Sequence, residues 1–443
     1  MIKTTNLFIM DDNKILHTIP KDLLMIIISY DPVLIFNLPE SSYTKYDWYA
    51  LIKNNFSLTY SKGTTTNNDM MKTYIWNCIK DDLNCDISAG SNHIIIKKTN
   101  GELMSCGRND RNQLGYKTNQ TNQLYFGKIN ALSKNMLISQ VNCGTCHTII
   151  KLDSGKLLGI GFHVALGCED SGHNDQFRKI PNVPKNISQI ICGSDYTFIL
   201  LTDGTLIACG LNSNGRLGCG KKEYITQFTK IDNIPENIVE VACGHSHTII
   251  RLIDGTLMST GNNLYGQLGH NDKKYRNKFE EIKDIPKNIV QVACGIYHTI
   301  IRLTDGTLMG CGGNNYGELG LLKLSHVTTF VQIENIPKNI VEVACGYYYS
   351  IIRLTDGTLM SCGENMYGEL GHGDNKSRNA FTIIEDIPKN IIQLMCKGQY
   401  TLIRLTDDTI MCCGSNQFGQ FGNNSSTSKN KFVKVFNINT IKN

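Results

Sequence analysis

Short runs of apolar and β-branched residues recur along the chain, separated by turns rich in Gly, Asp and Asn. The pattern is clear in residues 238–282, where four runs occupy Ile238–Cys243, Thr248–Leu252, Thr256–Thr260 and Lys278–Ile282. The first two runs alternate between apolar and polar positions or are continuously apolar, as half-buried and buried strands are. The pattern therefore predicts four short β-strands in this region.

The same pattern returns at a nearly constant spacing. Six copies open with a glycine and a seventh has a lysine at that place, and these residues are Gly90, Gly144, Gly193, Gly244, Gly295, Gly346 and Lys397. The gaps between them are 54, 49, 51, 51, 51 and 51 residues. Such a period is typical of units that bury a core only by stacking on their neighbours. We predict a mainly β fold, a seven-bladed β-propeller of four-stranded blades over residues 85–438, with residues 439–443 as a tail.

The connections between strands also repeat. Asp254-Gly255 predicts a two-residue hairpin turn between the second and third strands. An Ile-Pro-Lys-Asn step at 285–288 links one copy to the next, and its proline keeps the link extended and outside the sheet. Phe432–Phe436 is expected to form the last outer strand. Whether the two ends of the chain share one blade stays open at this point.

Three repeated motifs resemble those of a known family. The motifs Cys-Gly-x-x-His-Thr, Asp-Gly-Thr-Leu and Gly-x-Asn-x-Tyr-Gly-Gln-Leu-Gly are similar to the repeats of the regulator of chromosome condensation family. The resemblance implies a seven-bladed propeller. It also brings two functions of the founding member into consideration, nucleotide exchange on a small nuclear GTPase through an inserted hairpin, and chromatin binding through a basic N-terminal tail. A fold is a scaffold for many functions, so the resemblance defines the function less than the fold.

Residues 1–84 lie outside the repeat and are predicted to form a small helical domain and a linker. A helix is expected at Thr18–Tyr30 and a second one at Asp69–Lys80. Residues 19–24 (Ile-Pro-Lys-Asp-Leu-Leu) and 48–51 (Trp-Tyr-Ala-Leu) resemble the two ends of an F-box, although Pro39 interrupts the middle. The resemblance implies that a Skp-type adaptor binds the following residues: Pro20, Leu23, Leu24, Ile27 and Trp48. The alternative is a helical cap on the propeller, with these residues in its core.

Charge and hydropathy exclude several classes of protein. The net charge is +5, of which residues 1–84 contribute −1 and the remainder +6. This balance does not indicate a nucleic-acid partner, for which a domain pI above ~9 is typical. The N-terminus lacks a basic segment followed by an apolar run, and the longest apolar run, Leu23–Ile28, is too short for a membrane span. We expect an intracellular protein, cytoplasmic or nuclear, that is neither secreted nor bound to a membrane.

Most of the 17 cysteines are explained by the repeat. One repeat position holds Cys143, Cys192, Cys243, Cys294, Cys345 and Cys396, and a second holds Cys106, Cys209, Cys311, Cys362 and Cys413. We expect them to fill the narrow inner part of each blade as small apolar residues. The odd number favours free thiols over disulfides. Cys143-Gly-Thr-Cys146-His147 matches a haem-attachment pattern, but Cys143 and His147 are ordinary repeat positions, so no haem is expected.

Two further rings of polar residues follow from the repeat. The first is His93, His147, His247 and His298, with Tyr196, Tyr349 and Tyr400 in the other copies. Because His alternates with Tyr, a shared packing and hydrogen-bonding role is favoured over metal binding. The second, the basic ring, is Lys97, Lys151, Arg251, Arg302, Arg353 and Arg404, with Leu200 as its exception. These cations either pair with an Asp that follows within three residues, which we favour, or bind an acidic partner or phosphates.

No catalytic motif is present. We find no phosphate-binding Gly-x-x-x-x-Gly-Lys-Ser/Thr, no nucleophile elbow and no zinc-protease helix, and we expect no enzyme activity, metal or cofactor. The favoured function is a protein-interaction scaffold, in its sharper form an F-box-like adaptor for a ubiquitin ligase whose propeller binds the target protein. The alternatives are a guanine-nucleotide exchange factor for a small GTPase and a chromatin- or DNA-associated propeller. The copies are nearly uniform in length, and copy two departs most, with Gly161–Gly167 in place of the usual loop.

Overall fold

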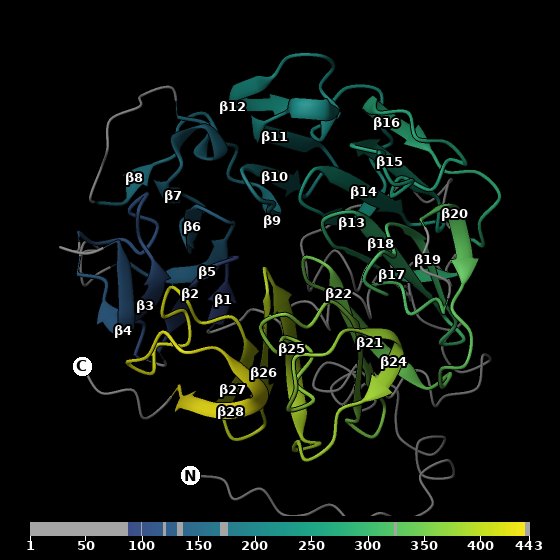
Figure 1. Cartoon of the computed structure of the whole chain (residues 1–443). Coiled ribbons are helices and arrows are strands. Elements are labelled where there is room, and N and C mark those ends of the chain that lie inside the picture. Colours follow the sequence, from purple (N-terminus) through teal and green to yellow (C-terminus); the bar gives the residue numbers. More distant parts are fainter. Residues whose placement is uncertain are drawn as a thin grey trace, which may run out of the picture. The chain divides into compact units, whose positions relative to one another are not determined.

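The structure is a computed structural model that describes residues 87–98, 100–117, 121–130, 136–168, 176–322 and 326–438. These residues belong to the second of the two units into which the chain divides, Asn84–Asn443. They form seven four-stranded antiparallel sheets arranged in a ring (Figure 1). The predicted seven-bladed propeller is therefore confirmed. The two predicted N-terminal helices and the proposed adaptor face, from Pro20 to Trp48, lie outside the described residues.

Each blade consists of four strands that are consecutive in the chain. Blade 1 contains β1 (Ile87–Ala89), β2 (His93–Lys97), β3 (Leu103–Arg108) and β4 (Asn122–Lys128). Blade 2 contains β5 (Ile138–Cys143), β6 (His147–Leu152), β7 (Leu157–Gly161) and β8 (Arg178–Lys179), with the 3-10 helix η2 (His163–Leu166) after β7. Blade 3 contains β9 (Ile187–Cys192), β10 (Tyr196–Leu201), β11 (Leu206–Leu211) and β12 (Tyr224–Lys230), with η3 (Ser213–Gly215) after β11.

The remaining blades repeat the same arrangement. Blade 4 contains β13 (Ile238–Cys243), β14 (His247–Leu252), β15 (Leu257–Gly261) and β16 (Arg276–Glu281). Blade 5 contains β17 (Ile289–Cys294), β18 (His298–Leu303), β19 (Leu308–Gly312) and β20 (Val327–Gln332). Blade 6 contains β21 (Ile340–Cys345), β22 (Tyr349–Leu354), β23 (Leu359–Gly363) and β24 (Arg378–Ile383). Blade 7 contains β25 (Ile391–Lys397), β26 (Tyr400–Leu405), β27 (Thr409–Gly414) and β28 (Lys429–Asn437).

The hairpin between the second and third strands is longer than predicted. In blade 4 the Leu252 N–H donates to the Thr256 carbonyl over 2.9 Å, which leaves residues 253–255 as a three-residue loop. Gly255 has a φ of 83°, the left-handed conformation that a β-bulge at the end of such a loop requires. The predicted two-residue turn was therefore wrong. Its Asp254 instead caps the loop, because the carboxylate accepts a hydrogen bond of 2.9 Å from the Thr256 N–H.

The hydrophobic core lies between neighbouring blades. One cluster joins Phe198 and Leu206 of blade 3 to Ile250 and Phe279 of blade 4, and all four side chains are buried. Similar clusters join blades 4 and 5, and blades 6 and 7. A single blade therefore buries its apolar faces only against two neighbours, as expected for repeats that cannot form a core alone.

A polar latch also joins each blade to the next. In blade 4 the main-chain carbonyl of Gln267, in the β15–β16 loop, accepts hydrogen bonds from two side chains of blade 5, the Thr299 hydroxyl (2.8 Å) and the Cys311 thiol (3.5 Å). The equivalent carbonyls of the other blades are Gln113, Ala165, Arg216, Glu318, Glu369 and Gln420, and each accepts from the following blade. The latch thus provides a hydrogen-bond donor for one buried main-chain carbonyl at every blade interface.

The His and Tyr ring belongs to the same interfaces. His247 Nε2 lies 3.0 Å from the Thr299 hydroxyl of blade 5. That hydroxyl already donates to a carbonyl, so it accepts from the histidine, and the histidine is the Nε2–H tautomer. Burial lowers the pKa of the four ring histidines to about 3, which keeps them neutral. Tyr196 performs the equivalent task by donating to the Gly244 carbonyl over 2.7 Å. The predicted shared packing and hydrogen-bonding role is confirmed.

The ring closes without a shared blade. Among the described residues, blade 1 consists of β1–β4 and blade 7 of β25–β28, and Figure 1 shows the two side by side. Tyr400 donates to the Gly90 carbonyl over 2.9 Å, and the Cys106 thiol donates to the Gln420 carbonyl over 3.3 Å. An isolated β-bridge between Tyr125 and Asn423 adds a main-chain link. Closure therefore uses the same side-chain contacts as the other interfaces.

Copy two keeps the latch although it loses the usual loop sequence. In blade 2 the helix η2 replaces the loop, and Gly167 ends it with a φ of 67°. The carbonyl of Ala165 in this helix accepts from Thr197 (2.7 Å) and Cys209 (3.4 Å) of blade 3. The main chain thus supplies the same acceptor while the side chains differ.

In the described part of the chain, no helix has the length and apolar character needed to cross a bilayer.

Candidate functional site

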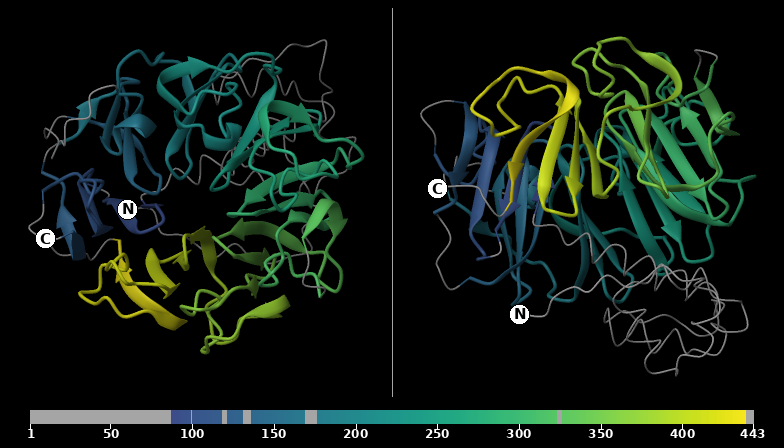
Figure 2. Two further views of the ribbon diagram at one scale, coloured as in Figure 1. Left: turned by 45° about the horizontal axis from the view of Figure 1, so that its top comes forward. Right: turned by 90° about the horizontal axis from the view of Figure 1, so that it is seen from below.

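The two ends of the propeller channel carry different parts of the repeat. Strands run along the ring axis, as the side view in Figure 2 shows. Because neighbouring strands are antiparallel, the turns between first and second strands and the loops between third and fourth strands lie at one end, here called the loop face. The hairpins between second and third strands and the Ile-Pro-Lys-Asn links lie at the other end, here called the hairpin face.

The basic ring lies near the hairpin face, on the second strand of each blade. Arg251 donates from Nε to Glu240 over 2.8 Å, and Arg353 donates to Glu342 over the same distance. Arg302 donates to the Gln291 side-chain oxygen over 3.2 Å. Each partner lies directly across from its arginine on the first strand of the blade. The ring therefore ties two neighbouring strands together.

Other members of the basic ring reach the next blade. Lys151 donates to the Ile187 carbonyl over 2.9 Å, and Lys97 to the Ile138 carbonyl over 3.4 Å. In blade 7, Arg404 pairs with Asp408 over 2.5 Å.

The predicted partners of the basic ring were the aspartates at 153, 254, 305, 356 and 407. This prediction was wrong. Asp305, for example, caps its own hairpin by accepting a hydrogen bond from the Thr307 N–H. A role of the basic ring toward an acidic partner stays a prediction.

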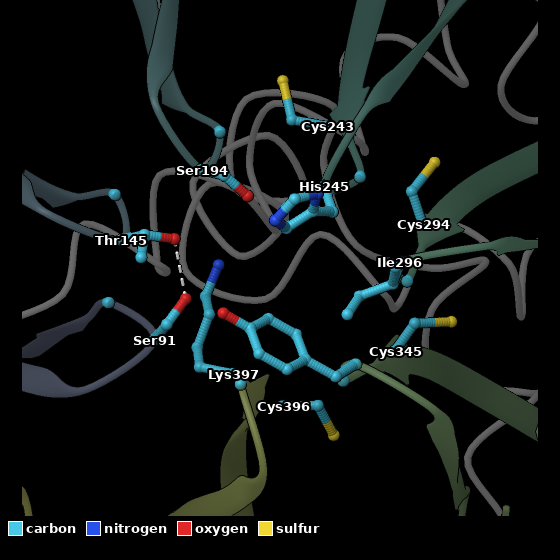
Figure 3. Close-up of a pocket in the computed structure, with 18 of the residues that line it drawn as sticks. Ser91, Thr145, Ser194, Cys243, His245, Cys294, Ile296, Cys345, Cys396 and Lys397 are labelled. Atoms are coloured by element: carbon cyan, nitrogen blue, oxygen red, sulfur yellow. Dashed lines mark hydrogen bonds between the residues drawn. The ribbon is translucent and has the colours of Figure 1, made fainter. Parts of the chain in front are cut away.

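The two cysteine rings occupy different places. The first ring, at the ends of the first strands, lines the channel, as Figure 3 shows for Cys243, Cys294, Cys345 and Cys396. The second ring lies on the third strands, fully buried at the blade interfaces, where its thiols join the latch. The expectation that both rings fill the inner part of the blades was therefore right only for the first. None of the cysteines in the described residues forms a disulfide, and burial raises the pKa values of the thiols in both rings above that of an ordinary thiol.

The channel opens on the loop face through a polar ring, here called the channel mouth. It consists of Ser91, Thr145, Ser194, His245, Ile296, Tyr347 and Lys397. The hydroxyls of Ser91 and Thr145 are 2.8 Å apart, and both lie within hydrogen-bonding reach of the Tyr347 hydroxyl. Burial is the main reason that the pKa of His245 is lowered, and the imidazole is therefore neutral. The cavity here has a volume of about 70 Å³, room for about two water molecules.

Lys397 is the departure from repeat symmetry at this mouth. The equivalent residue is glycine in the other copies, and a side chain there would collide with the ring histidine or tyrosine: a Cβ on Gly90 would lie 2.5 Å from His93 Cε1. In blade 7 the first strand extends by one residue, so that Lys397 pairs with Tyr400. The next residue, Gly398, has a φ of 51°, whereas the opening glycines of the other copies do not have a positive φ. Figure 3 shows the Lys397 side chain extending from blade 7 toward Ser91, Thr145 and Ser194.

An aromatic patch adjoins the mouth over blades 4 to 6. It consists of Leu264, Tyr265, Tyr297, Tyr316, Tyr348 and Met366. Its rings form a continuous series. The centre of the Tyr297 ring lies 4.6 Å from the centre of the Tyr265 ring and 6.0 Å from that of Tyr348, and the ring centres of Tyr316 and Tyr348 are 5.3 Å apart. Met366 is 63% exposed, Leu264 49% and Tyr316 44%. Tyr265, Tyr297 and Tyr348 are half-buried. Exposed apolar side chains beside a series of aromatic rings mark a candidate interaction surface.

Arginines occupy the other side of the loop face. Arg108 pairs with Asp110 over 2.6 Å and lies 5.3 Å from the centre of the Phe418 ring. Arg111 lies 5.9 Å from the centre of the Phe162 ring. Arg216 of blade 3 is buried and donates to the His245 carbonyl over 3.0 Å. The loop face therefore has an aromatic side over blades 4 to 6 and arginines over blades 1 and 3.

Two carboxylates lie buried beneath the aromatic patch. Glu318 and Glu369 occupy a position where blades 1, 4 and 7 carry Gln113, Gln267 and Gln420. Each accepts a hydrogen bond from a main-chain N–H of its own loop, Glu369 over 2.7 Å from Tyr367. Burial, with a smaller contribution from the nearby Glu364 carboxylate, raises the pKa of Glu369 to about 7. The second oxygen of Glu369 and one of Glu364 have no hydrogen-bond partner among the described residues.

The sequence interpretation missed both the channel mouth and the aromatic patch. The signal for the mouth was present, because Lys397 is the only residue at its repeat position that is not glycine. The aromatic residues come from turns and loops of three different copies, and only the ring arrangement brings them together. No cluster of three or more His, Cys, Asp or Glu side chains suited to a metal ion occurs among the described residues.

Comparison with known proteins agrees with this fold. Two models of the regulator of chromosome condensation (RCC1) repeat match the chain, one at residues 85–113, 187–216, 238–267, 289–318 and 340–369, the other at 203–250, 254–301 and 305–352. The ultraviolet-B receptor UVR8 of Arabidopsis thaliana is 27% identical over 359 residues, which cover 79% of this chain and 80% of the receptor. The probable E3 ubiquitin-protein ligase HERC6 of Homo sapiens is 28% identical over 71% of this chain. This chain spans only 27% of that ligase.

Solved structures show the same architecture. Prp20p of Saccharomyces cerevisiae superimposes with a TM-score of 0.64 at 22% identity, covering 72% of this chain and 81% of Prp20p. Human WBSCR16 superimposes with a TM-score of 0.63 at 19% identity, covering 72% of this chain and 85% of that protein. Identities this low establish the fold alone. The matched repeats, the seven sheets and these superpositions together show that the chain carries RCC1 repeats folded into a seven-bladed β-propeller.

Proposed function

We propose that this chain is a non-enzymatic interaction protein whose propeller binds a protein partner through its loop face. The aromatic patch is the observation that carries the proposal. Exposed tyrosines combine a large apolar surface with a hydroxyl, and few rotatable bonds are lost when they are buried against a partner. The latches and interblade cores hold the patch on a rigid support, so little order has to be gained on binding.

The loop face suits recognition better than the hairpin face. On the hairpin face, Arg251 and Arg353 are engaged with carboxylates of their own blades. On the loop face, Leu264 and Met366 project from loops at blades 4 and 6, and the tyrosines between them form a continuous surface. Variable loops on a fixed scaffold are the usual location of binding residues in such folds.

Two sets of surface substitutions test this proposal. The triple variant Leu264→Ser, Tyr316→Ser, Met366→Ser removes the most exposed side chains of the patch. The matched control is Val341→Ser, Ile383→Ser, Ile392→Ser, which removes three apolar side chains, 36%, 46% and 44% exposed, near the hairpin face. Affinity capture with quantitative mass spectrometry should show at least a tenfold loss of specific partners for the patch variant only. Equal capture by both variants would contradict the proposal.

We further propose that residues 1–84 recruit a Skp-type adaptor, so that the propeller presents its bound protein to a ubiquitin ligase. The support is the match of residues 19–24 and 48–51 to the ends of an F-box. Several relatives with similar repeats are named as ubiquitin ligases, although the chain spans about a quarter of their length. Leu23→Asp with Leu24→Asp in the full chain should abolish adaptor capture. Capture of partners by the propeller should persist, and unchanged adaptor capture would refute this role.

Nucleotide exchange on a small GTPase and chromatin binding are the two alternative functions. The solved structure of Prp20p is described together with its binding to Gsp1p and histones, but the similarity to this chain extends to the fold only. Each blade contains the same four strands in the described residues, with no additional hairpin on either face. Purified full-length chain should not accelerate nucleotide release from a small GTPase, and its retention on DNA should be weak and lost with added salt.

A further inference from the structure

We propose that the channel mouth binds one anionic group, a carboxylate or a phosphate, from an extended segment of the protein partner, with Lys397 as its counter-ion. The proposal rests on the proposed function for the identity of the partner. The anion site itself stands on the geometry of the mouth.

The first observation is the local rebuilding around Lys397. Six blades place glycine at this position because any side chain would collide with the ring histidine or tyrosine three residues later. In blade 7, β25 extends to residue 397, and the residue that follows, Gly398, takes a left-handed conformation that the opening glycines of the other blades do not have. A sequence that departs from its own repeat at one site, with a compensating change beside it, marks that site as functional rather than structural.

The second observation is the position of the ammonium group. The electrostatic influence of Lys397 reaches the thiols of Cys143, Cys192 and Cys243, which belong to blades 2, 3 and 4 on the other side of the channel. The side chain therefore extends into the channel mouth and not over the outer rim of blade 7. Figure 3 shows it directed toward Ser91, Thr145 and Ser194.

The third observation is that no salt bridge fixes the ammonium of Lys397, although the carboxylate of Asp195 acts electrostatically on His245 and Tyr347 of the mouth. None of the ion pairs found among the described residues involves Lys397. The cysteines around it are neutral, because burial raises their pKa values. Burial also keeps His245 neutral by lowering its pKa. The ammonium is thus a single positive charge in a narrow, half-buried opening.

The donors around the ammonium suit an oxyanion. Main-chain N–H groups of the mouth already donate across blades, Thr145 to the Ser194 carbonyl (3.0 Å) and Tyr347 to the Gly398 carbonyl (2.9 Å). The Ser91 and Thr145 hydroxyls share one hydrogen bond of 2.8 Å, which leaves one proton of this pair, together with the Ser194 hydroxyl, to donate beside the lysine. Hydrogen bonds between an ammonium or hydroxyl and an anionic oxygen are short and about twice as strong as neutral ones. The cavity of about 70 Å³ has room for a small oxyanion.

Charges on the surrounding loops favour the same ligand. Arg108, Arg111 and Arg216 lie on the loop face near the mouth, against the carboxylates of Asp110 and Asp195. With Lys397 these groups give four positive charges and two negative ones, and Glu364 adds a carboxylate beside Tyr348 on the aromatic side. The aromatic patch begins at Tyr348, the residue after Tyr347 of the mouth. A partner segment with an acidic residue beside apolar or aromatic residues therefore fits the two surfaces together.

The anion site is tested on the full chain by nuclear magnetic resonance. Reductive methylation with ¹³C-formaldehyde labels each lysine and retains its charge, and the Lys397→Arg variant identifies the Lys397 signal. Sodium acetate and inorganic phosphate are then titrated separately at constant ionic strength. The Lys397 signal should shift to saturation at a concentration at least ten times lower than the signal of Lys338, which is exposed near the hairpin face. If the two lysines respond equally, the site is refuted. A response to acetate alone assigns a carboxylate, and one to phosphate alone assigns a phosphate group.

Partner binding is tested separately with charge variants. Lys397→Gln should weaken capture of the loop-face partners at least fivefold, Lys397→Arg should retain most of it, and Lys338→Gln should have no effect. If anions bind Lys397 but Lys397→Gln captures partners normally, the assignment of the anion to the partner is wrong. If the aromatic-patch variant captures normally while Lys397 still binds anions, the proposed function fails and the anion site remains.

Discussion

The two faces of the propeller use their charged residues in opposite ways. Near the hairpin face, Arg251 and Arg353 are fixed by carboxylates on the neighbouring strand, and Lys151 by a carbonyl of the next blade. At the loop face, Lys397 projects into a polar opening without an ion-pair partner among the described residues, beside an exposed aromatic patch. A charge that recurs in most copies therefore holds the scaffold together, whereas a charge found in one copy is available for a ligand.

The largest effect is expected from breaking a buried pair near the hairpin face. Glu240→Leu leaves the buried Arg251 guanidinium without its carboxylate and removes an acceptor of the Val292 N–H, which should lower the free energy of unfolding by about 4 kcal/mol. The double variant Glu240→Gln, Arg251→Leu copies blade 3, where Gln189 lies opposite Leu200. Urea unfolding should place the double variant within about 1 kcal/mol of the native protein. A single variant as stable as the double would contradict the structural role of the pair.

The next largest change in the free energy of unfolding is expected at the opening glycines, and not at the equivalent Lys397. Gly295→Ala should lower the free energy of unfolding by about 3 kcal/mol, because its Cβ would collide with the buried ring of His298 and approach the Gly346 carbonyl. Lys397→Ala, at the equivalent position, keeps an existing Cβ and should change stability by less than about 1 kcal/mol. Thermal unfolding of the two variants under the same conditions measures the difference. Equal destabilisation would show that blade 7 is not rebuilt as described.

A smaller change, in this case an increase in the free energy of unfolding, is expected from substituting Glu369 beneath the aromatic patch. Glu369 keeps its proton in the folded chain up to about pH 7, whereas the carboxyl of an unfolded chain releases it near pH 4.5. The stabilising contribution of the protonated form is therefore complete below pH 4.5 and lost as the pH rises through 7. Glu369→Gln, which copies Gln267 of blade 4, should raise the free energy of unfolding by roughly 2 to 3 kcal/mol at pH 8 and leave it unchanged near pH 4.5.

The measurement is unfolding as a function of pH with two controls. Glu364 is the charged group whose carboxylate raises the pKa of Glu369, so Glu364→Gln should reproduce part of the gain at pH 8. Gln267→Glu should produce the reverse, a loss at pH 8 that disappears in acid. A gain from Glu369→Gln that does not depend on pH would mean that packing, and not ionisation, is responsible.

The smallest effect is expected for an exposed pair of the loop face. Arg108→Gln breaks the ion pair with Asp110, which is partly exposed and screened by solvent. The free energy of unfolding should change by no more than about 0.5 kcal/mol, and the change should vanish in high salt. Parallel unfolding curves at low and high NaCl test this, with Glu240→Leu as the salt-insensitive comparison. A loss as large as that of Glu240→Leu would remove the distinction between the two faces.

Residue periodicity was sufficient to predict the strands but not the partners of their side chains. The strand predicted at Ile238–Cys243 has those bounds in the structure, because apolar alternation and turn glycines are local signals. The partner of Arg251 was predicted as Asp254, three residues away, and is Glu240 on the neighbouring strand. Local spacing suggested the nearer acid, but strand register decides which side chains face each other.

The same limit applies to the second cysteine ring. The repeat showed that these positions hold small apolar residues, which predicted correctly that they are buried. Its location did not follow, since the carbonyl that accepts from Cys311 belongs to Gln267, 44 residues earlier in the chain. Only the stacking of blades brings these groups together.

The sequence by itself determined that the chain is a closed array of seven four-stranded units, because the repeated pattern of strands and turn glycines admits few other ways of burying its apolar faces. Which residues are available for function depends on how the seven blades pack. In the closed ring, the recurring Arg, His and Cys side chains form hydrogen bonds between strands and between blades. It left Lys397 and the tyrosines of three blades together on one face. Those residues are distant in the chain, and only a long-range arrangement could assemble them.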